Sequence, residues 1–195
     1  MKKNLFIRVD SSPEIGIGHI MRCLTLAQEL KNNFDKVIFL TRKDSDYFMK
    51  TITENGFEVF LLPAQTIKPP KNLHELNDYS DIIKNLITTY TKNKNYLLID
   101  HYEVDSDFES SLKNTFEKIF VIDDLANRKH NCDLLIDQNY HKDLNHRYEK
   151  LIPNGAITLL GPKYAIIRPE FRRINKKTIK KKFTNKKNTS FIWRF

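Results

Sequence analysis

The chain has 195 residues, of which 40% are hydrophobic and 29% charged, a composition typical of one globular domain. The hydrophobic fraction excludes a mainly disordered chain, and no apolar run reaches the roughly 18 residues that a membrane-spanning helix needs. The net charge of +9 is concentrated at one end: residues 163–195 hold 12 basic side chains and one acidic one, and the first 162 hold 21 basic and 23 acidic. A nearly neutral body does not favour nucleic-acid binding.

In chain order, the predicted elements are strand 4–9, helix 20–30, strand 36–40, helix 44–54, strand 57–62, loop 63–72, helix 73–90, strand 96–99, helix 105–116, strand 118–122 and strand 133–136. The strands are short apolar runs, and the helices carry apolar residues at helical spacing. This alternation predicts an α/β fold with a Rossmann-like parallel sheet and helices on both faces.

Neither the N-terminus nor the cysteines indicates export. The first ten residues lack the apolar core and cleavage site of a secretory signal. Cys23 and Cys132 form neither a zinc-binding spacing nor a disulfide framework, so we interpret them as buried thiols in a reducing compartment. The sequence spacing typical of metal ligands is also absent at His74, which lies at a loop–helix junction, and at His130, His141 and His146, which lie in polar connections. We therefore expect a cytoplasmic protein without a metal.

Polar residues follow three of the predicted strands. They are Asp10, Ser11 and Ser12 after the first strand, Asp100, His101 and Tyr102 after the fourth, and Asp123 and Asp124 after the fifth. Ligands of such sheets bind outside the carboxyl ends of the strands, so these residues are candidates for a site. The alternative is that they cap the next helix or turn, which we favour for Asp123 and Asp124.

The sharpest local motif lies between the first strand and the first helix. Gly16 and Gly18 allow a tight backbone turn and bring His19 to the helix N-terminus, where the neutral, proton-accepting imidazole is favoured. His19 is thus either a general acid or base, or a helix cap. Position 21 is Met rather than a third glycine, which argues against a dinucleotide fingerprint. Arg22, one turn later, either binds a substrate phosphate, pairs with Asp10 or forms a surface salt bridge.

Together these residues resemble a known family. The order and spacing of the blocks at 8–10, 15–22, 26–27, 100–102, 122–126, 130–133 and 160–171 are similar to those of the UDP-2,4-diacetamido-2,4,6-trideoxy-β-L-altropyranose hydrolases of pseudaminic acid biosynthesis. The resemblance runs over residues 3–171. It implies the N-terminal half of a GT-B-type fold, in which two Rossmann-like domains face one another across a cleft.

The resemblance also implies a reaction: water attacks the anomeric carbon of the nucleotide sugar with inversion and releases UDP, without metal or other cofactor. His19 would be the general base, and Tyr102 would lie near the attacking water. The other residues that the resemblance places at the substrate are Asp10, Gly16, Gly18, Arg22 and Asp100. The expected partner is a small-molecule nucleotide sugar.

The family pattern continues into a second domain that holds the UDP contacts, whereas this chain ends at Phe195. We therefore expect residues 1–171 to be the sugar-side domain, and 172–195 to be a basic interdomain linker with a truncated or frameshifted tail. A separate C-terminal half would then be a partner. Two alternatives remain open: an inactive isolated lobe, and a related GT-B glycosyltransferase whose base deprotonates an acceptor hydroxyl.

Overall fold

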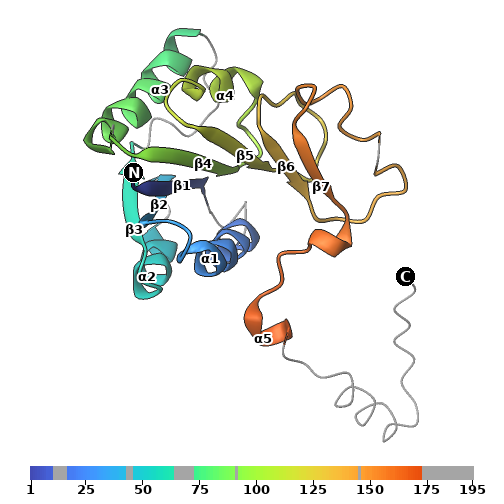
Figure 1. Cartoon of the computed structure of the whole chain (residues 1–195), viewed down its shortest axis with the longest axis horizontal. Helices are drawn as coiled ribbons and strands as arrows, with labels where there is room; N and C mark the ends of the chain where they lie inside the picture. The colour runs from blue at the N-terminus through green and yellow to red at the C-terminus, as the bar shows by residue number, and fades with distance from the viewer. Residues whose placement is uncertain (11–16, 43–45, 64–72, 91, 145, 173–195) are drawn as a thin grey trace, which may run out of the picture.

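A computed structural model describes residues 1–10, 17–42, 46–63, 73–90, 92–144 and 146–172. Within these residues the chain forms a seven-stranded sheet of order β3-β2-β1-β4-β5-β6-β7, in which all neighbouring strands are parallel (Figure 1). The strands are β1 Lys3–Val9, β2 Lys36–Arg42, β3 Glu58–Leu62, β4 Lys94–Asp100, β5 Lys118–Ile122, β6 Leu134–Asp137 and β7 Ile157–Leu160.

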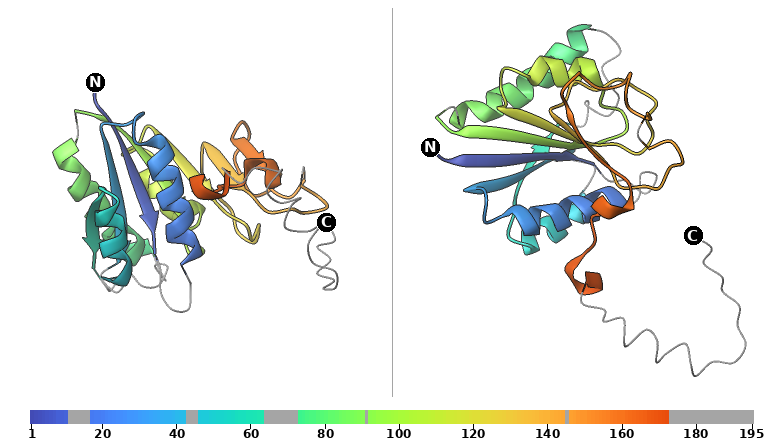
Figure 2. Two further views of the ribbon diagram at one scale, coloured as in Figure 1. Left: turned by 90° about the horizontal axis from the view of Figure 1, so that it is seen from below. Right: turned by 45° about the vertical axis from the view of Figure 1, so that its right-hand side comes forward.

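Helices cover both faces of the sheet. On one face lie α1 Gly18–Leu30 and α2 Asp46–Glu54, and on the other lie α3 Leu73–Ile87 and α4 Ser106–Leu112 (Figures 1 and 2). Successive side chains of β1 point to opposite faces of the sheet, since Leu5 and Ile7 join the core under α1 and α2 while Phe6 joins the core under α3 and α4. The predicted α/β fold class is confirmed.

The chain order of the strands creates a switch point in the sheet. From β1 the chain passes outward to β2 and β3, and it then returns to the other side of β1 as β4. The connections that follow β1 and β4 therefore leave in opposite directions, and a crevice opens at the carboxyl ends of these two strands. Asp10 and Asp100 lie there, directly after β1 and at the end of β4.

The sequence prediction differs from the structure in two helices and one strand. Helix α4 ends at Leu112 rather than at Phe116, and the 3-10 turn Thr88–Tyr90 follows α3 instead of a continued helix. Strand β7 was missed, because it is a four-residue edge strand whose first two residues are exposed and whose pattern shows no buried alternation. Most of the predicted loop, 64–72, and the tail beyond residue 172 lie outside the described residues.

After β7 the chain turns back towards α1 through the 3-10 helix η4 Pro162–Tyr164 and reaches the short helix α5 Pro169–Arg172 (Figure 2). Ile166 packs against the same core as α1, and its backbone N–H donates to the side chain of Gln138 at 3.0 Å. The segment after β7 thus belongs to the same body as the sheet.

Candidate active site

The Asp10 carboxylate joins the ends of β1, β2 and β4. It accepts hydrogen bonds from Arg8 (2.6 and 2.7 Å) and from the backbone N–H of Arg42 (3.0 Å), and it forms an ion pair with Nε of Arg42 at 2.7 Å. Burial opposes ionisation of Asp10, but Arg8 and the hydrogen bond from His101 outweigh it, so the pKa of Asp10 is well below its usual range. Asp10 is therefore an ionised carboxylate that holds the ends of these strands together.

His101 is held in one neutral form by its neighbours. The backbone N–H of Glu103 donates to Nδ1 at 3.1 Å, so Nε2 carries the proton and donates to Asp10 at 2.9 Å. Burial lowers the pKa of His101, which disfavours the imidazolium. Both ring nitrogens are occupied, and His101 has no nitrogen left to take a proton from a substrate.

The carboxylate of Asp100 binds both His19 and Arg22 and orients the His19 ring. Its carboxylate accepts from His19 Nδ1 at 2.6 Å and from Nε and Nη2 of Arg22, both at 2.5 Å. Its side chain is fully buried. Burial opposes ionisation, yet the hydrogen bonds from Arg22 and His19 hold the pKa of Asp100 below its usual value. A carboxylate in this position fixes the imidazole tautomer with the proton on Nδ1.

His19 is consequently the histidine able to act as a base here. It is the second residue of α1, as predicted, and it lines a cavity of about 130 Å³ with Asp10, Asp100, His101, Tyr102 and Glu103. Nδ1 lies 2.6 Å from Asp100 and 3.1 Å from Nη2 of Arg22, and the shorter contact with the carboxylate favours the proton on Nδ1, which leaves Nε2 to accept a proton. The ring of Tyr102 stands edge-on to His19, with centroids 4.6 Å apart and an interplanar angle of 87°.

Two of the interpretations of Arg22 are wrong: it does not pair with Asp10, and it does not form a surface salt bridge. Its side chain is 12% exposed and binds Asp100, with a further contact of 3.3 Å from Nη1 to Asp124. Arg22 is not among the residues that line the cavity. The guanidinium is committed to these two carboxylates.

The two glycines have different outcomes. Gly16 lies outside the described residues. Gly18 begins α1 without a positive φ, and a Cβ built on it would meet no atom within 4 Å. Gly18 therefore leaves open space beside His19 rather than relieving a strained turn.

The sequence prediction gave Asp123 and Asp124 the same capping role, but the structure gives them different partners. Asp123 does cap the following turn, since its carboxylate accepts the N–H of Ala126 at 2.8 Å, and this prediction is confirmed. Asp124 instead reaches across to Arg22. Arg42 was also missed; its place directly at the end of β2 was the available signal.

His130 lies in the connection between β5 and β6, as the sequence predicted, but its side chain does not face the solvent. It is buried, and its Nδ1 contacts Oε1 of the buried Glu109 at 2.7 Å. Burial raises the pKa of Glu109, and the interaction with His130 opposes that rise. Distant chain segments create this pair, so no local pattern could reveal it.

The part of the chain that the structure describes contains no group of three or more His, Cys, Asp and Glu side chains arranged to hold a metal ion. The same residues include no helix long and apolar enough to cross a membrane.

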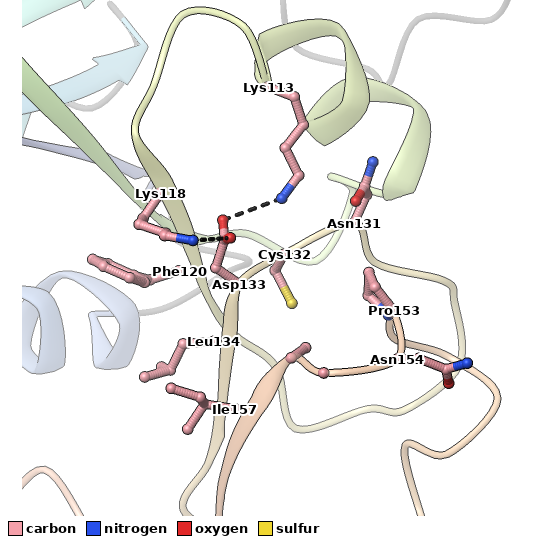
Figure 3. A pocket seen from close by; sticks show the side chains of 12 residues that line it. Lys113, Lys118, Phe120, Asn131, Cys132, Asp133, Leu134, Pro153, Asn154 and Ile157 are labelled. Atoms are coloured by element: carbon pink, nitrogen blue, oxygen red, sulfur yellow. Dashed lines mark hydrogen bonds and ion pairs between the residues drawn. The ribbon is translucent and has the colours of Figure 1, made fainter.

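A larger cavity, of about 450 Å³, lies at the opposite, amino end of β5, β6 and β7 (Figure 3). There Lys113 and Lys118 both point at Asp133, at 3.1 and 2.9 Å, and Asp133 also accepts the backbone N–H of Ile119. Cys132 lines the same cavity, and burial raises its pKa to about 12. These charged groups hold strands together and include no oriented base, so the smaller cavity is the candidate site.

Fold and site define an α/β Rossmann-like protein with a His–Asp pair at the switch point of its sheet. No protein-family model matches the chain. It is 31% identical over 181 residues to the UDP-2,4-diacetamido-2,4,6-trideoxy-β-L-altropyranose hydrolase of Campylobacter jejuni, covering 92% of this chain and 57% of the relative. It is 30% identical over 178 residues to an uncharacterised protein of Methanocaldococcus jannaschii, covering 89% and 32%.

The chain thus spans less than two thirds of the length of either relative, and the likeness supports a distant relationship. Among solved structures, MurG of Acinetobacter baumannii superposes with a TM-score of 0.52 at 7% identity, over 81% of this chain and 44% of MurG. At this identity the match shows the fold alone.

Proposed function

We propose that this chain carries the general base of a nucleotide-sugar hydrolase that releases UDP from a UDP-linked diacetamido-trideoxy sugar. The observation that carries the proposal is the His19–Asp100 pair, with Nδ1 and Oδ1 2.6 Å apart, facing a cavity beside Tyr102. The distant likeness to the Campylobacter hydrolase supports the substrate class.

In the proposed reaction, Nε2 of His19 removes a proton from water while the water oxygen bonds to the anomeric carbon. The bond from that carbon to the diphosphate oxygen breaks, and UDP leaves with the electron pair. Asp100 stabilises the imidazolium that forms, and a positioned base of this kind contributes roughly 10²- to 10⁴-fold in rate. A diphosphate is a good leaving group, so no second carboxylic acid is required.

The surface around the site suggests how UDP is held. Large apolar side chains are exposed in the connections that follow five strands, β1, β4, β5, β6 and β7; they are Ile17, Tyr102, Leu125, Tyr140 and Ile167. Exposed apolar side chains beyond the carboxyl ends of the strands favour contact with another protein surface. We propose that a C-terminal half like the remainder of the Campylobacter hydrolase binds here and supplies the UDP contacts.

The test is release of UDP from UDP-2,4-diacetamido-2,4,6-trideoxy-β-L-altropyranose by the purified chain, alone and with the remaining part of the Campylobacter hydrolase added as a separate polypeptide. We expect His19→Asn to lower turnover at least about a hundredfold. The matched control is His146→Asn, because His146 is exposed and its side chain pairs with Glu149, three residues away, in the described structure. Equal turnover in His19→Asn and the control would remove His19 from the base role.

A glycosyltransferase remains the second candidate, because an imidazole base deprotonates a sugar hydroxyl as readily as water. Product analysis with and without an added sugar acceptor separates the two, since hydrolysis yields the free sugar and transfer yields a glycoside. An isolated lobe without activity would release no UDP under either condition.

A further inference from the structure

Arg128 lies in the connection that follows β5, and each of its three guanidinium nitrogens donates a hydrogen bond to a different acceptor. Nε donates to the carbonyl oxygen of Val104 at 2.7 Å, and Nη2 donates to the carbonyl oxygen of His101 at 3.0 Å. Nη1 donates to Oδ1 of the fully buried Asp123 carboxylate at 2.7 Å. Arg128 thus connects the end of β5 to both ends of the turn 101–104.

This turn follows β4 and carries three of the residues that line the small cavity, His101, Tyr102 and Glu103. The side chains of Tyr102 and Glu103 are exposed, so packing in the core does not fix where they lie. The turn is instead held at its two ends, where His101 and Val104 are buried and their carbonyl oxygens accept from Arg128. Losing the donor to such carbonyl oxygens leaves polar groups without a partner near the interior, which destabilises this placement of the turn.

The chain around Arg128 is itself held in place. The Asp123 carboxylate also accepts the backbone N–H of Ala126 at 2.8 Å and the hydroxyl of the buried Tyr148 at 3.0 Å. One residue beyond Arg128, the carbonyl oxygen of Lys129 accepts the backbone N–H of the first residue of α4 at 2.9 Å. The guanidinium therefore projects from a fixed segment and has a fixed position relative to the turn.

We propose that Arg128 is a positioning residue for the candidate active site: its guanidinium holds the turn 101–104 so that the ring of Tyr102 stays beside His19. The inference rests on the proposed function for the reaction that His19 performs. Arg128 is not among the residues that line the cavity, so it acts through the turn rather than by touching the substrate. A planar guanidinium reaches two carbonyl oxygens and a carboxylate at once, whereas the lysine ammonium is a single nitrogen on a flexible chain.

The first experiment needs no substrate and uses Arg128→Lys, which keeps the positive charge beside Asp123. NMR measures the exchange of the Glu103 amide hydrogen, which is bonded to Nδ1 of His101 inside the turn. We expect this exchange to become at least about fivefold faster. We also expect the nuclear Overhauser effect between the rings of Tyr102 and His19 to weaken. If both stay as in the parent chain, the proposal is overturned.

The matched control is Arg147→Lys. The Arg147 side chain is 21% exposed, against 15% for Arg128, and it also binds a carboxylate and a carbonyl oxygen, those of Asp137 and Asp124. Arg147→Lys should therefore perturb the fold to a similar extent and leave the Glu103 amide unchanged. Equal acceleration of this amide in the two variants would show that Arg128 supports the fold in general, and would overturn the proposal.

The second experiment is kinetic. We expect Arg128→Lys to lower kcat for UDP release about tenfold and to change KM less than about twofold, because misplaced groups slow the chemical step. Arg147→Lys should keep kcat within about twofold of the parent chain. An unchanged kcat in Arg128→Lys, or a raised KM alone, overturns the proposal. Circular dichroism checks folding, and Arg128→Gln is the second variant, read in the same way. Where the parent chain shows no turnover, the proposed function fails, and the amide exchange still decides the role of Arg128.

Discussion

The two ends of the sheet place charged side chains in different surroundings. At the carboxyl end, the side chains of Asp10 and Asp100 are fully buried and bind arginine and histidine, around a cavity of about 130 Å³. At the amino end, Asp133 is 23% exposed and binds two lysines beside a cavity of about 450 Å³. The larger cavity carries no oriented base. Burial and the direction of hydrogen bonds, rather than cavity size, therefore identify the candidate chemistry.

The largest expected contrast is in turnover. Asp100→Asn should lower UDP release at least about a hundredfold, because an amide does not hold the Nδ1–H tautomer of His19 or stabilise its imidazolium. Asp133→Asn, at the other end, should stay within about twofold of the parent chain. Both are measured in the UDP-release assay above. Equal losses in the two variants would break the contrast between the ends.

The free energy of unfolding should also depend more on the carboxyl end of the sheet than on the amino end. Asp10→Ala should cost about 3 to 5 kcal/mol of unfolding free energy, because it takes the carboxylate away from the buried guanidinium groups of Arg8 and Arg42. Asp133→Ala should cost several-fold less, since exposed ion pairs are screened by water. Urea unfolding followed by circular dichroism measures both. A larger loss for Asp133→Ala would show that the ion pairs of Asp133 with Lys113 and Lys118 stabilise the fold more than the ion pairs of Asp10 do.

Acid should destabilise the carboxyl end of the sheet. The pKa values of Asp10 and Asp100 are lowered in the folded chain, so both stabilise it fully above the unfolded pKa of about 3.9. As pH falls below that value, the two carboxylates bind protons in the unfolded chain but not in the folded chain. The free energy of unfolding therefore declines until the pH reaches the folded pKa values. We expect Asp100→Asn to flatten this decline between about pH 4 and 2 in urea titrations. An unchanged slope would contradict the lowered pKa of Asp100.

The smallest expected effect concerns the two thiols. Burial raises the pKa of Cys132 to about 12 and raises the pKa of Cys23 well above its usual value, with the Asp100 charge adding to the rise in Cys23. Because the thiolate is the reactive form, iodoacetamide at pH 8 should modify both slowly in the folded chain and quickly in urea. Mass spectrometry gives the rates. Faster reaction of Cys23 than of Cys132 would contradict the tighter enclosure of the thiol beside Asp100.

Several parts of the site were predictable because they depend on local rules. Short apolar strands alternating with amphipathic helices specify a parallel sheet, and such a sheet directs ligands to its carboxyl edge. Asp10, Asp100 and Tyr102 were recognised by their positions at that edge, and His19 by its place at the start of the first helix. The structure brings all four to one cavity.

Other features were not predictable because they depend on which segments the fold brings together. Arg22 pairs with Asp100, 78 positions away, and with Asp124, 102 positions away. His130 meets Glu109 in the interior, and β7 forms only by pairing with β6. No spacing within a helix or strand encodes these distances.

The α/β class, the order of most elements and the strand ends where polar residues gather follow from the amino-acid sequence, because apolar periodicity is set residue by residue along the chain. Which histidine keeps a ring nitrogen for chemistry depends on the folded arrangement. His101 and His19 both lie near a buried carboxylate, but the hydrogen bonds around them occupy both nitrogens of His101 and leave Nε2 of His19 to accept a proton. The direction of a hydrogen bond depends on where its partners lie in space, and that is settled when distant strands pair.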